Sequence, residues 1–208
     1  VRTDPSKGRK GISCFFVDRG TPGLSMRLIP VIRPYYPSEL VFKDCVVPHA
    51  NLLGGEGEGL DLALRLLTRN RFTYSASNIG VAVAALRMAV AYAKQRSTFG
   101  QLLSQRQAIQ WMLADSEVEI RAARWLTWEG AWQVDRGEDH RHEASIAKLY
   151  SSELLGRVVD RAVQIHGGYG VAKEVPLERW YREARVRRIG EGPSEVQRLV
   201  IARNLLRG

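Results

Sequence analysis

The pattern of apolar and polar positions changes its character after about residue 55. Before that point, apolar runs at 12–17, 26–31 and 39–47 are separated by segments rich in glycine and proline. Runs of this length bounded by turn residues are typical of β-strands. A glycine-rich stretch at 51–59 then follows. We therefore expect three short strands followed by a hinge.

From about residue 60 onward, apolar residues recur with the period of an α-helix. Short connections separate the periodic segments, so neighbouring helices should pack antiparallel. The expected helices cover 60–94, 102–134 and 142–166, with two shorter ones that begin at Pro176 and near Pro193.

Each long helix has one face with a distinct composition. On the first, small residues predict close packing against a neighbouring helix; they are Ala76, Gly80 and Ala84. The expected core stripe of that helix consists of Ser75, Ile79, Val83, Leu86 and Val90. Trp125, Trp128 and Trp132 share one face of the second helix. The stripe of the third consists of Ala147, Ser151, Leu154, Val158, Ala162 and Ile165.

The pattern predicts a mainly α fold. We expect a C-terminal antiparallel four-helix bundle with short extra helices, preceded by a partial β-barrel-like segment. The domain boundary is placed so that 1–55 form the β part and 56–208 the helical domain. Three short strands leave sheet edges uncovered, so the β part is expected to be the second half of a larger domain.

Composition fits an ordinary globular protein. The 208 residues are 45% hydrophobic and 25% charged. Cys14 and Cys45 lack metal-ligand spacing and are expected to be reduced, buried thiols, and no metal site is expected. The apolar stretch near 79–90 contains Arg87 and is too short to span a bilayer. We therefore expect a soluble protein without a signal peptide or a membrane partner.

The formal net charge is +9, and arginines are concentrated at 179–188. A basic protein can bind nucleic acid, anionic membranes or phosphorylated ligands. A solvated helix face on which these arginines pair with Glu178 and Glu183 explains the cluster without a ligand, and we favour it. Charge alone does not choose between these possibilities.

The segment 190–194, Gly-Glu-Gly-Pro-Ser, places a carboxylate between two glycines. Glycines allow the backbone to turn sharply and to admit a ligand closely. If that ligand also excludes water, Glu191 becomes a plausible general base. A surface acid near a helix start is the ordinary explanation for such a segment.

Two further motifs have the form of helix ends with glycine stops. They are Arg-Ser-Thr-Phe-Gly-Gln at 96–101 and Gln-Ile-His-Gly-Gly at 164–168. The glycines of the second motif would end the third helix by adopting a left-handed conformation. An arginine suits phosphate because its planar donors bind two oxygens at once. His166 is expected to be a packing or hydrogen-bonding residue.

In this order, the three motifs resemble the C-terminal region of the acyl-CoA dehydrogenase family. The family's base loop is matched at Glu191, Gly192, Ser194, Gln197 and Arg198. The resemblance covers essentially the whole chain. It implies FAD as cofactor and an acyl-CoA thioester as substrate. The family's N-terminal helical domain and the front of its β domain have no counterpart in the chain, which we expect to be truncated at its N-terminal side.

The resemblance also implies roles for individual residues. Glu191 would be the catalytic base that removes the α-proton while FAD N5 accepts the β-hydride, and Arg71 and Gly192 would contact the substrate. Pro193 and Glu195 replace a threonine and a glutamine that are common in the family, and Thr68 replaces an acid that contacts CoA in some relatives. The implied FAD contacts are Arg96, Thr98, Phe99, Gln107, Gln164, Gly167, Gly168, Pro193 and Glu195. In the family, the 96–107 and 164–168 segments contact the FAD held by a neighbouring subunit.

The expected function is therefore flavin-dependent α,β-dehydrogenation of an acyl-CoA by a homodimer or homotetramer. Electrons would pass to an electron-transferring flavoprotein or to oxygen, and the protein would lie in the bacterial cytoplasm or the mitochondrial matrix. Two alternatives stay open. One is a non-catalytic helical assembly fragment of such an enzyme, and the other is a DNA-binding member of the same family. The presence of Glu191 argues against nucleic-acid binding.

Overall fold

The computed structural model describes residues 1–207. They form two compact units, the first from Val1 to Leu67 and the second from Thr68 onward. The division falls within helix α1, Gly59–Gln95, so this helix belongs to both units. The predicted boundary at 55/56 lies just before the helix begins.

The first unit is built from short strands in antiparallel pairs. β1 pairs with β4, and β2 pairs with β3. Its elements are the 3-10 helices η1 (Pro5–Gly11) and η2 (His49–Asn51) and the strands β1 (Cys14–Phe15), β2 (Leu24–Leu28), β3 (Ser38–Phe42) and β4 (Leu52–Leu53).

The strands are shorter than predicted. β2 ends at Leu28, two residues before Pro30, which has no amide to donate to a ladder. β3 ends at Phe42, two residues before Asp44, whose φ of 50° breaks the extended backbone. Cys14 and Cys45 are free, as predicted, but both are half-buried rather than buried.

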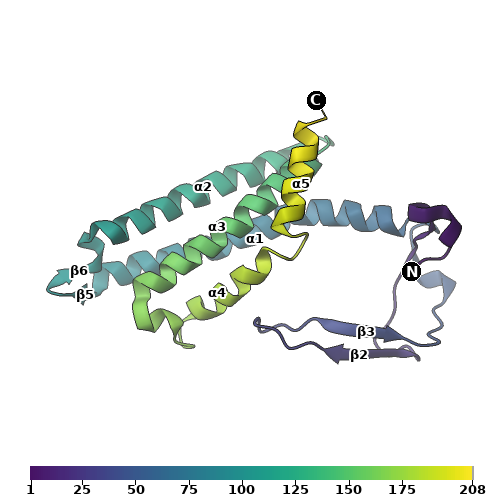
Figure 1. The fold of residues 1–208 in the computed structure, drawn as a ribbon, viewed down its shortest axis with the longest axis horizontal. Coiled ribbons are helices and arrows are strands. Elements are labelled where there is room, and N and C mark those ends of the chain that lie inside the picture. The colour runs from purple at the N-terminus through teal and green to yellow at the C-terminus, as the bar shows by residue number, and fades with distance from the viewer. Residues whose placement is uncertain (208) are drawn as a thin grey trace. The chain divides into compact units, whose positions relative to one another are not determined.

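The second unit is helical, and the predicted mainly α fold is confirmed. α3 is its central helix because it packs against α2, α4 and α5 (Figure 1). Besides α1, the elements are β5 (Ser97–Thr98), β6 (Gln101–Leu102), η3 (Leu103–Gln105), α2 (Gln107–Asp135), α3 (Arg141–His166), η4 (Gly167–Val171), α4 (Pro176–Arg187) and α5 (Ser194–Leu205).

The predicted core stripe of α1 is confirmed at Ser75 and Ile79, which are buried, and at Val83 and Leu86, which pack against the core. The buried face also includes four alanines that were not predicted and are at most 1% exposed: Ala82, Ala85, Ala89 and Ala93. The small residues Ala76 and Gly80 are exposed, and a Cβ on Gly80 would meet nothing within 4 Å. The predicted packing through those residues is therefore wrong for this chain. Helix α1 carries small residues on two faces. The face with the buried alanines, and not the face with Ala76 and Gly80, packs into the core shared with α3.

The second long helix begins at Gln107 rather than at residue 102. A β-hairpin and a 3-10 turn occupy 97–105 instead. Its two-residue turn has positive φ at both Phe99 (50°) and Gly100 (74°), the geometry of a type I′ turn, which matches the twist of antiparallel strands. The Gln105 side chain accepts a hydrogen bond from the Leu102 amide at 3.3 Å, which holds the 3-10 turn before the helix begins.

The tryptophans of α2 share an outward face, as predicted from their spacing. Trp125, Trp128 and Trp132 are all more than half exposed, and the rings of the first two meet edge to face at 5.2 Å. α1 is long and apolar enough to cross a membrane by length and composition. The argument that this stretch is too short was therefore wrong, and 33% of its most apolar 18-residue window is buried in the structure.

Candidate active site

The loop between α4 and α5 carries Glu191 in a strained backbone conformation. Glu191 has φ of 58° and Gly192 has φ of 96°. A Cβ on Gly192 would lie 2.4 Å from Nε2 of Gln197, so a side chain is excluded by space as well as by φ. Pro193 then precedes the first residue of α5. The sequence Gly-Glu-Gly-Pro thus produces a sharp turn between the end of α4 and the start of α5.

The Glu191 carboxylate lacks a hydrogen bond at one oxygen. The residue is half-buried, and Oε2 is buried with no hydrogen-bond partner among residues 1–207. Its backbone carbonyl, in contrast, accepts hydrogen bonds from Arg71 Nε at 3.2 Å and from Gln197 Nε2 at 3.3 Å. The backbone is held while a carboxylate oxygen stays available, which suits a base that acts on a C–H bond.

Arg71, predicted to contact substrate, lies on α1 beside this loop. Burial lowers the pKa of its guanidinium, and the negative charge of Glu191 acts in the opposite direction. Gly192, the other predicted substrate contact, follows Glu191 directly. Pro193 and Glu195 are exposed at the start of α5. The structure therefore brings five predicted residues together in one cluster, which we call the Glu191 cluster: Arg71, Glu191, Gly192, Pro193 and Glu195.

Two buried residues that donate hydrogen bonds to this cluster were not predicted as functional. The Lys148 ammonium donates to the carbonyls of Arg188 at 3.1 Å and Gly192 at 2.8 Å. Gln197 is fully buried and donates through Nε2 to the carbonyls of Glu191 and Gly192. A signal existed for Lys148, because it lies three residues before Ser151 on a face that is otherwise apolar or small.

A carboxylate on α3 anchors the beginning of α5. The hydroxyl of Ser194 donates to Glu153 Oε1 at 2.7 Å, and the Arg188 side chain forms an ion pair with Glu153 Oε2 at 3.2 Å. The Ser194 amide also donates to the Arg188 carbonyl at 3.1 Å. These contacts fix both sides of the loop to one helix. At the arginine-rich face of α4, Arg182 pairs with Glu178, as predicted.

A second group of predicted residues surrounds the β5–β6 hairpin. Phe99, at the tip, is 99% exposed and has positive φ, although it is a bulky residue. Arg106 supports the turn from behind: it donates to the Thr98 carbonyl, and its guanidinium lies 5.9 Å from the centre of the Phe99 ring. The Arg96 guanidinium has no hydrogen bond or ion pair with any other residue that the structure describes, within 1–207.

Four further predicted FAD contacts are exposed, namely Gln107, Gln164, Gly167 and Gly168. They lie at the start of α2 and around the end of α3, at the same end of the bundle as the β5–β6 hairpin (Figure 1). Gln107 begins α2, and Gln164 lies in the last turn of α3. Gly167 ends that helix with φ of 60° and ψ of −140°, so its positive φ is as predicted but its ψ is not that of a left-handed helix. A Cβ on Gly167 or Gly168 would meet nothing within 4 Å. We call these residues, with Arg96, Thr98 and Phe99, the hairpin cluster.

His166, predicted to pack or to form a hydrogen bond, does both. It is buried, its Nδ1 lies 2.8 Å from the Ala162 carbonyl, and its ring stacks on Tyr92 at 4.3 Å. Because a carbonyl only accepts, Nδ1 carries the proton in this contact.

The structure does not bring the two clusters together. Arg71 lies 24 residues before Gln95, the last residue of α1. At 1.5 Å per residue, about 36 Å of continuous helix separate the two ends. The Glu191 cluster and the hairpin cluster of one chain therefore cannot contact the same small group of atoms.

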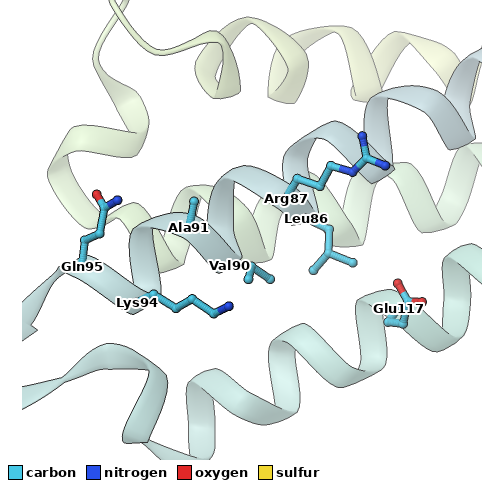
Figure 2. Close-up of a pocket in the computed structure, with 7 residues that line it drawn as sticks. All are labelled: Leu86, Arg87, Val90, Ala91, Lys94, Gln95 and Glu117. Carbon is cyan, nitrogen blue, oxygen red and sulfur yellow. The ribbon is translucent and has the colours of Figure 1, made fainter.

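An open groove of about 520 Å³ lies between α1 and α2, and it contains none of the predicted site residues. Figure 2 shows Leu86 and Val90 directed toward α2, from which Glu117 faces them. The groove is lined by Leu86, Arg87, Val90, Ala91, Lys94, Gln95 and Glu117. Among the described residues, no group of three or more His, Cys, Asp and Glu side chains is placed to hold a metal ion.

The chain is similar to known proteins over nearly its whole length. It is 41% identical to acryloyl-CoA reductase (NADH) of Anaerotignum propionicum, with 99% of this chain and 53% of that protein covered. It is 42% identical to the short-chain specific mitochondrial acyl-CoA dehydrogenase of Mus musculus, with 99% and 50% covered. The structure of butyryl-CoA dehydrogenase from Megasphaera elsdenii matches with a TM-score of 0.92 and 40% identity over 99% of this chain and 55% of that one.

The chain spans about half the length of these relatives. Residues 57–206 also match the family model of the acyl-CoA dehydrogenase C-terminal domain. Together with the mainly helical fold, these matches show that this chain belongs to the acyl-CoA dehydrogenase family.

Proposed function

We propose that this chain is part of an enzyme that dehydrogenates an acyl-CoA thioester between its α and β carbons, with Glu191 as the catalytic base. Glu191 would take the α-proton, and Arg71 and Gly192 would contact the substrate. FAD, when bound, would accept the β-hydride, so that a proton and a hydride leave together and a C=C bond forms.

The observation that carries the proposal is the state of the Glu191 carboxylate. Its Oε2 is buried and without a hydrogen-bond partner among residues 1–207, while the backbone carbonyl beside it accepts two hydrogen bonds. An unpaired buried carboxylate oxygen destabilises the fold. Its presence on a strained turn supports a functional role, because strain of this kind persists where the surroundings enforce it.

The hairpin cluster fits the phosphate and aromatic parts of FAD. The exposed Arg96 guanidinium, which has no hydrogen bond or ion pair among residues 1–207, suits a pyrophosphate. The fully exposed ring of Phe99 provides an apolar surface beside it. At Gly168 open space surrounds the position where a side chain would project, so a ligand can approach the backbone. Thr98, Gln107, Gln164 and Gly167 would complete this surface, while Pro193 and Glu195 would contact FAD at the Glu191 cluster.

The distance between the two clusters supports an oligomer. Because about 36 Å of α1 separate them, each FAD would contact the Glu191 cluster of one chain and the hairpin cluster of another. We therefore propose a homodimer or homotetramer. We further propose that electrons pass to an electron-transferring flavoprotein and that the protein resides in the bacterial cytoplasm or the mitochondrial matrix.

The proposal is tested by recording visible absorption spectra of the protein at its full natural length, with FAD, before and after an acyl-CoA is added. We expect flavin bands that short-chain acyl-CoA bleaches. Glu191→Gln should reduce the rate of bleaching by roughly 10³-fold, because the base is lost, and should leave FAD uptake unchanged.

Glu174→Gln is the matched control, since Glu174 is an exposed acid outside both clusters, and it should bleach at the wild-type rate. Near-wild-type bleaching by Glu191→Gln would refute the assignment of the base. A folded oligomer that takes up no FAD would instead support the non-catalytic assembly alternative.

A further inference from the structure

Lys148 places an ammonium group inside the helical unit. Its side chain is fully buried, and it lies on α3 between buried small residues. Lysine is among the residues least often fully buried unless it is paired. The Lys148 ammonium forms no ion pair within 4.0 Å with any carboxylate in the described part of the chain. Its buried charge therefore needs another explanation.

The Lys148 ammonium binds two backbone carbonyls. Nζ of Lys148 donates to the carbonyl of Arg188 at 3.1 Å and to that of Gly192 at 2.8 Å. Arg188 follows the last residue of α4, and Gly192 follows Glu191 directly. One side chain thus joins the two ends of the segment 188–192, which carries the proposed base.

The backbone of the segment 188–192 needs stabilising contacts. Two consecutive residues, Glu191 and Gly192, have positive φ, and such backbone persists only when surrounding contacts enforce it. Arg71 from α1 and Gln197 from α5 hold the carbonyl of Glu191 itself. Lys148 differs from both, because it connects the start of the segment with its end.

Stability alone does not account for a lysine at this position. Replacing a buried charge by an apolar side chain of similar volume is often neutral or stabilising. Burial lowers the pKa of Lys148 to about 8, with the Arg71 charge acting in the same direction and the carboxylates of Glu153, Glu191 and Glu195 opposing it. The amine is therefore still mainly protonated at neutral pH, despite the cost of its desolvation.

We propose that Lys148 is a positioning residue that clamps the carbonyls of Arg188 and Gly192 and so keeps the Glu191 carboxylate in its reactive orientation. The proposal rests on the function proposed above. Lys148 does not touch the reacting atoms, because both of its hydrogen bonds go to backbone carbonyls. Two hydrogen bonds of this kind restrict the conformations of the loop, so that the Glu191 carboxylate spends more time in its reactive orientation.

The first test measures the loop itself and does not depend on catalysis. Amide hydrogen exchange is compared in the full-length protein for Lys148→Met, which keeps the apolar stem but cannot donate, and for the control Lys173→Met at an exposed lysine. We expect exchange of peptides covering 188–194 to accelerate roughly tenfold or more in Lys148→Met. The control should match the wild type. Unchanged protection in Lys148→Met would overturn the proposal.

If Lys148→Met does not fold, Lys148→Gln gives the same comparison, because its shorter amide reaches at most one of the two carbonyls. Faster exchange confined to 188–194 supports the clamp. Faster exchange spread evenly over α3, α4 and α5 would show a general structural role and would overturn it.

The second test separates positioning from the base function. In the flavin-bleaching assay, Lys148→Met should lower kcat roughly 10- to 100-fold with KM changed much less. The double variant Lys148→Met/Glu191→Gln should react no more slowly than Glu191→Gln alone, because the clamp acts through the base. An additional loss in the double variant would overturn the proposal. If the wild-type protein bleaches no flavin, the proposed function fails, and the exchange comparison still decides the clamp.

Discussion

The Glu191 loop and the Phe99 turn share an unusual backbone conformation, but the first is surrounded by other residues and the second is exposed. In each, a non-glycine residue with positive φ is followed by a glycine with positive φ: 58° and 96° at Glu191 and Gly192, and 50° and 74° at Phe99 and Gly100. The first pair is enclosed by donors from three helices. The second lies at the tip of a hairpin, with the Phe99 ring 99% exposed.

The two turns differ in which side chains support them. Around Glu191, side chains from α1, α3 and α5 donate to the loop carbonyls, so contacts within one chain maintain its strain. At Phe99, the supporting contact is Arg106, which donates to the neighbouring Thr98 carbonyl. The Glu191 loop is thus organised by its own chain, whereas the proposed oligomer and cofactor would supply further contacts to the Phe99 turn.

The sharpest comparison is between two glycine-to-alanine substitutions. Gly192→Ala should reduce the free energy of unfolding by roughly 3–4 kcal/mol, because it adds backbone strain and displaces the Gln197 amide, which lies 2.4 Å from the new Cβ. Gly100→Ala should cost only about 1 kcal/mol, because its Cβ meets nothing within 4 Å. Denaturant unfolding measures both.

Equal losses of unfolding free energy in the two alanine variants would contradict this prediction. They would mean that the positive φ alone, and not the surroundings of the glycine, determines the loss. Gly80→Ala serves as the control for the substitution itself. Gly80 lies within α1 with open space around it, so its replacement should stabilise the protein slightly, by about 0.5–1 kcal/mol.

The next prediction concerns pH and Lys148. Its pKa is about 8 in the folded protein and 10.5 in the reference state. Between these values the unfolded chain binds the proton and the folded chain does not, so the contribution of Lys148 to stability rises with pH across this window. Below pH 8 the full cost of burying the charge is present. The change between pH 7.5 and pH 10 should be about 2–3 kcal/mol.

Unfolding free energies measured at pH 7.5 and pH 10 for the wild type and for Lys148→Met isolate this effect from other groups. The difference between the two proteins should shift by that amount in favour of the wild type as pH rises. A pH-independent difference would show that the Lys148 charge is not desolvated. The hairpin cluster contains no buried lysine, so Phe99 variants should follow the wild-type pH dependence.

Features that depend on neighbouring residues in the sequence could be predicted, whereas contacts between residues far apart in the sequence could not. The Glu191 turn could be recognised because glycine and proline act locally. Lys148 could be noticed as a lysine on an otherwise apolar or small face, but its role could not be predicted, because its partners lie 40 and 44 residues away in sequence and depend on how α3 packs against the loop. Close helix packing at Ala76 and Gly80 was predicted wrongly because α1 has small residues on two faces, and only tertiary packing decides which of these faces is buried.

The smallest effect on the free energy of unfolding is expected for a substitution at Phe99. This substitution tests directly whether the Phe99 turn, unlike the Glu191 loop, is independent of contacts within its own chain. Phe99→Ser removes a ring that is 99% exposed and whose recorded ring contact is the Arg106 guanidinium 5.9 Å away. The free energy of unfolding should therefore stay within about 0.5 kcal/mol of the wild type. Affinity for FAD, followed by flavin fluorescence during titration, should fall roughly tenfold or more, because the ring would lose its external contact. Tyr181→Ser, at an exposed aromatic of α4, should leave that affinity unchanged. A Phe99→Ser protein that unfolds more easily yet binds FAD normally would mean that the turn is held from within its own chain, as the Glu191 loop is.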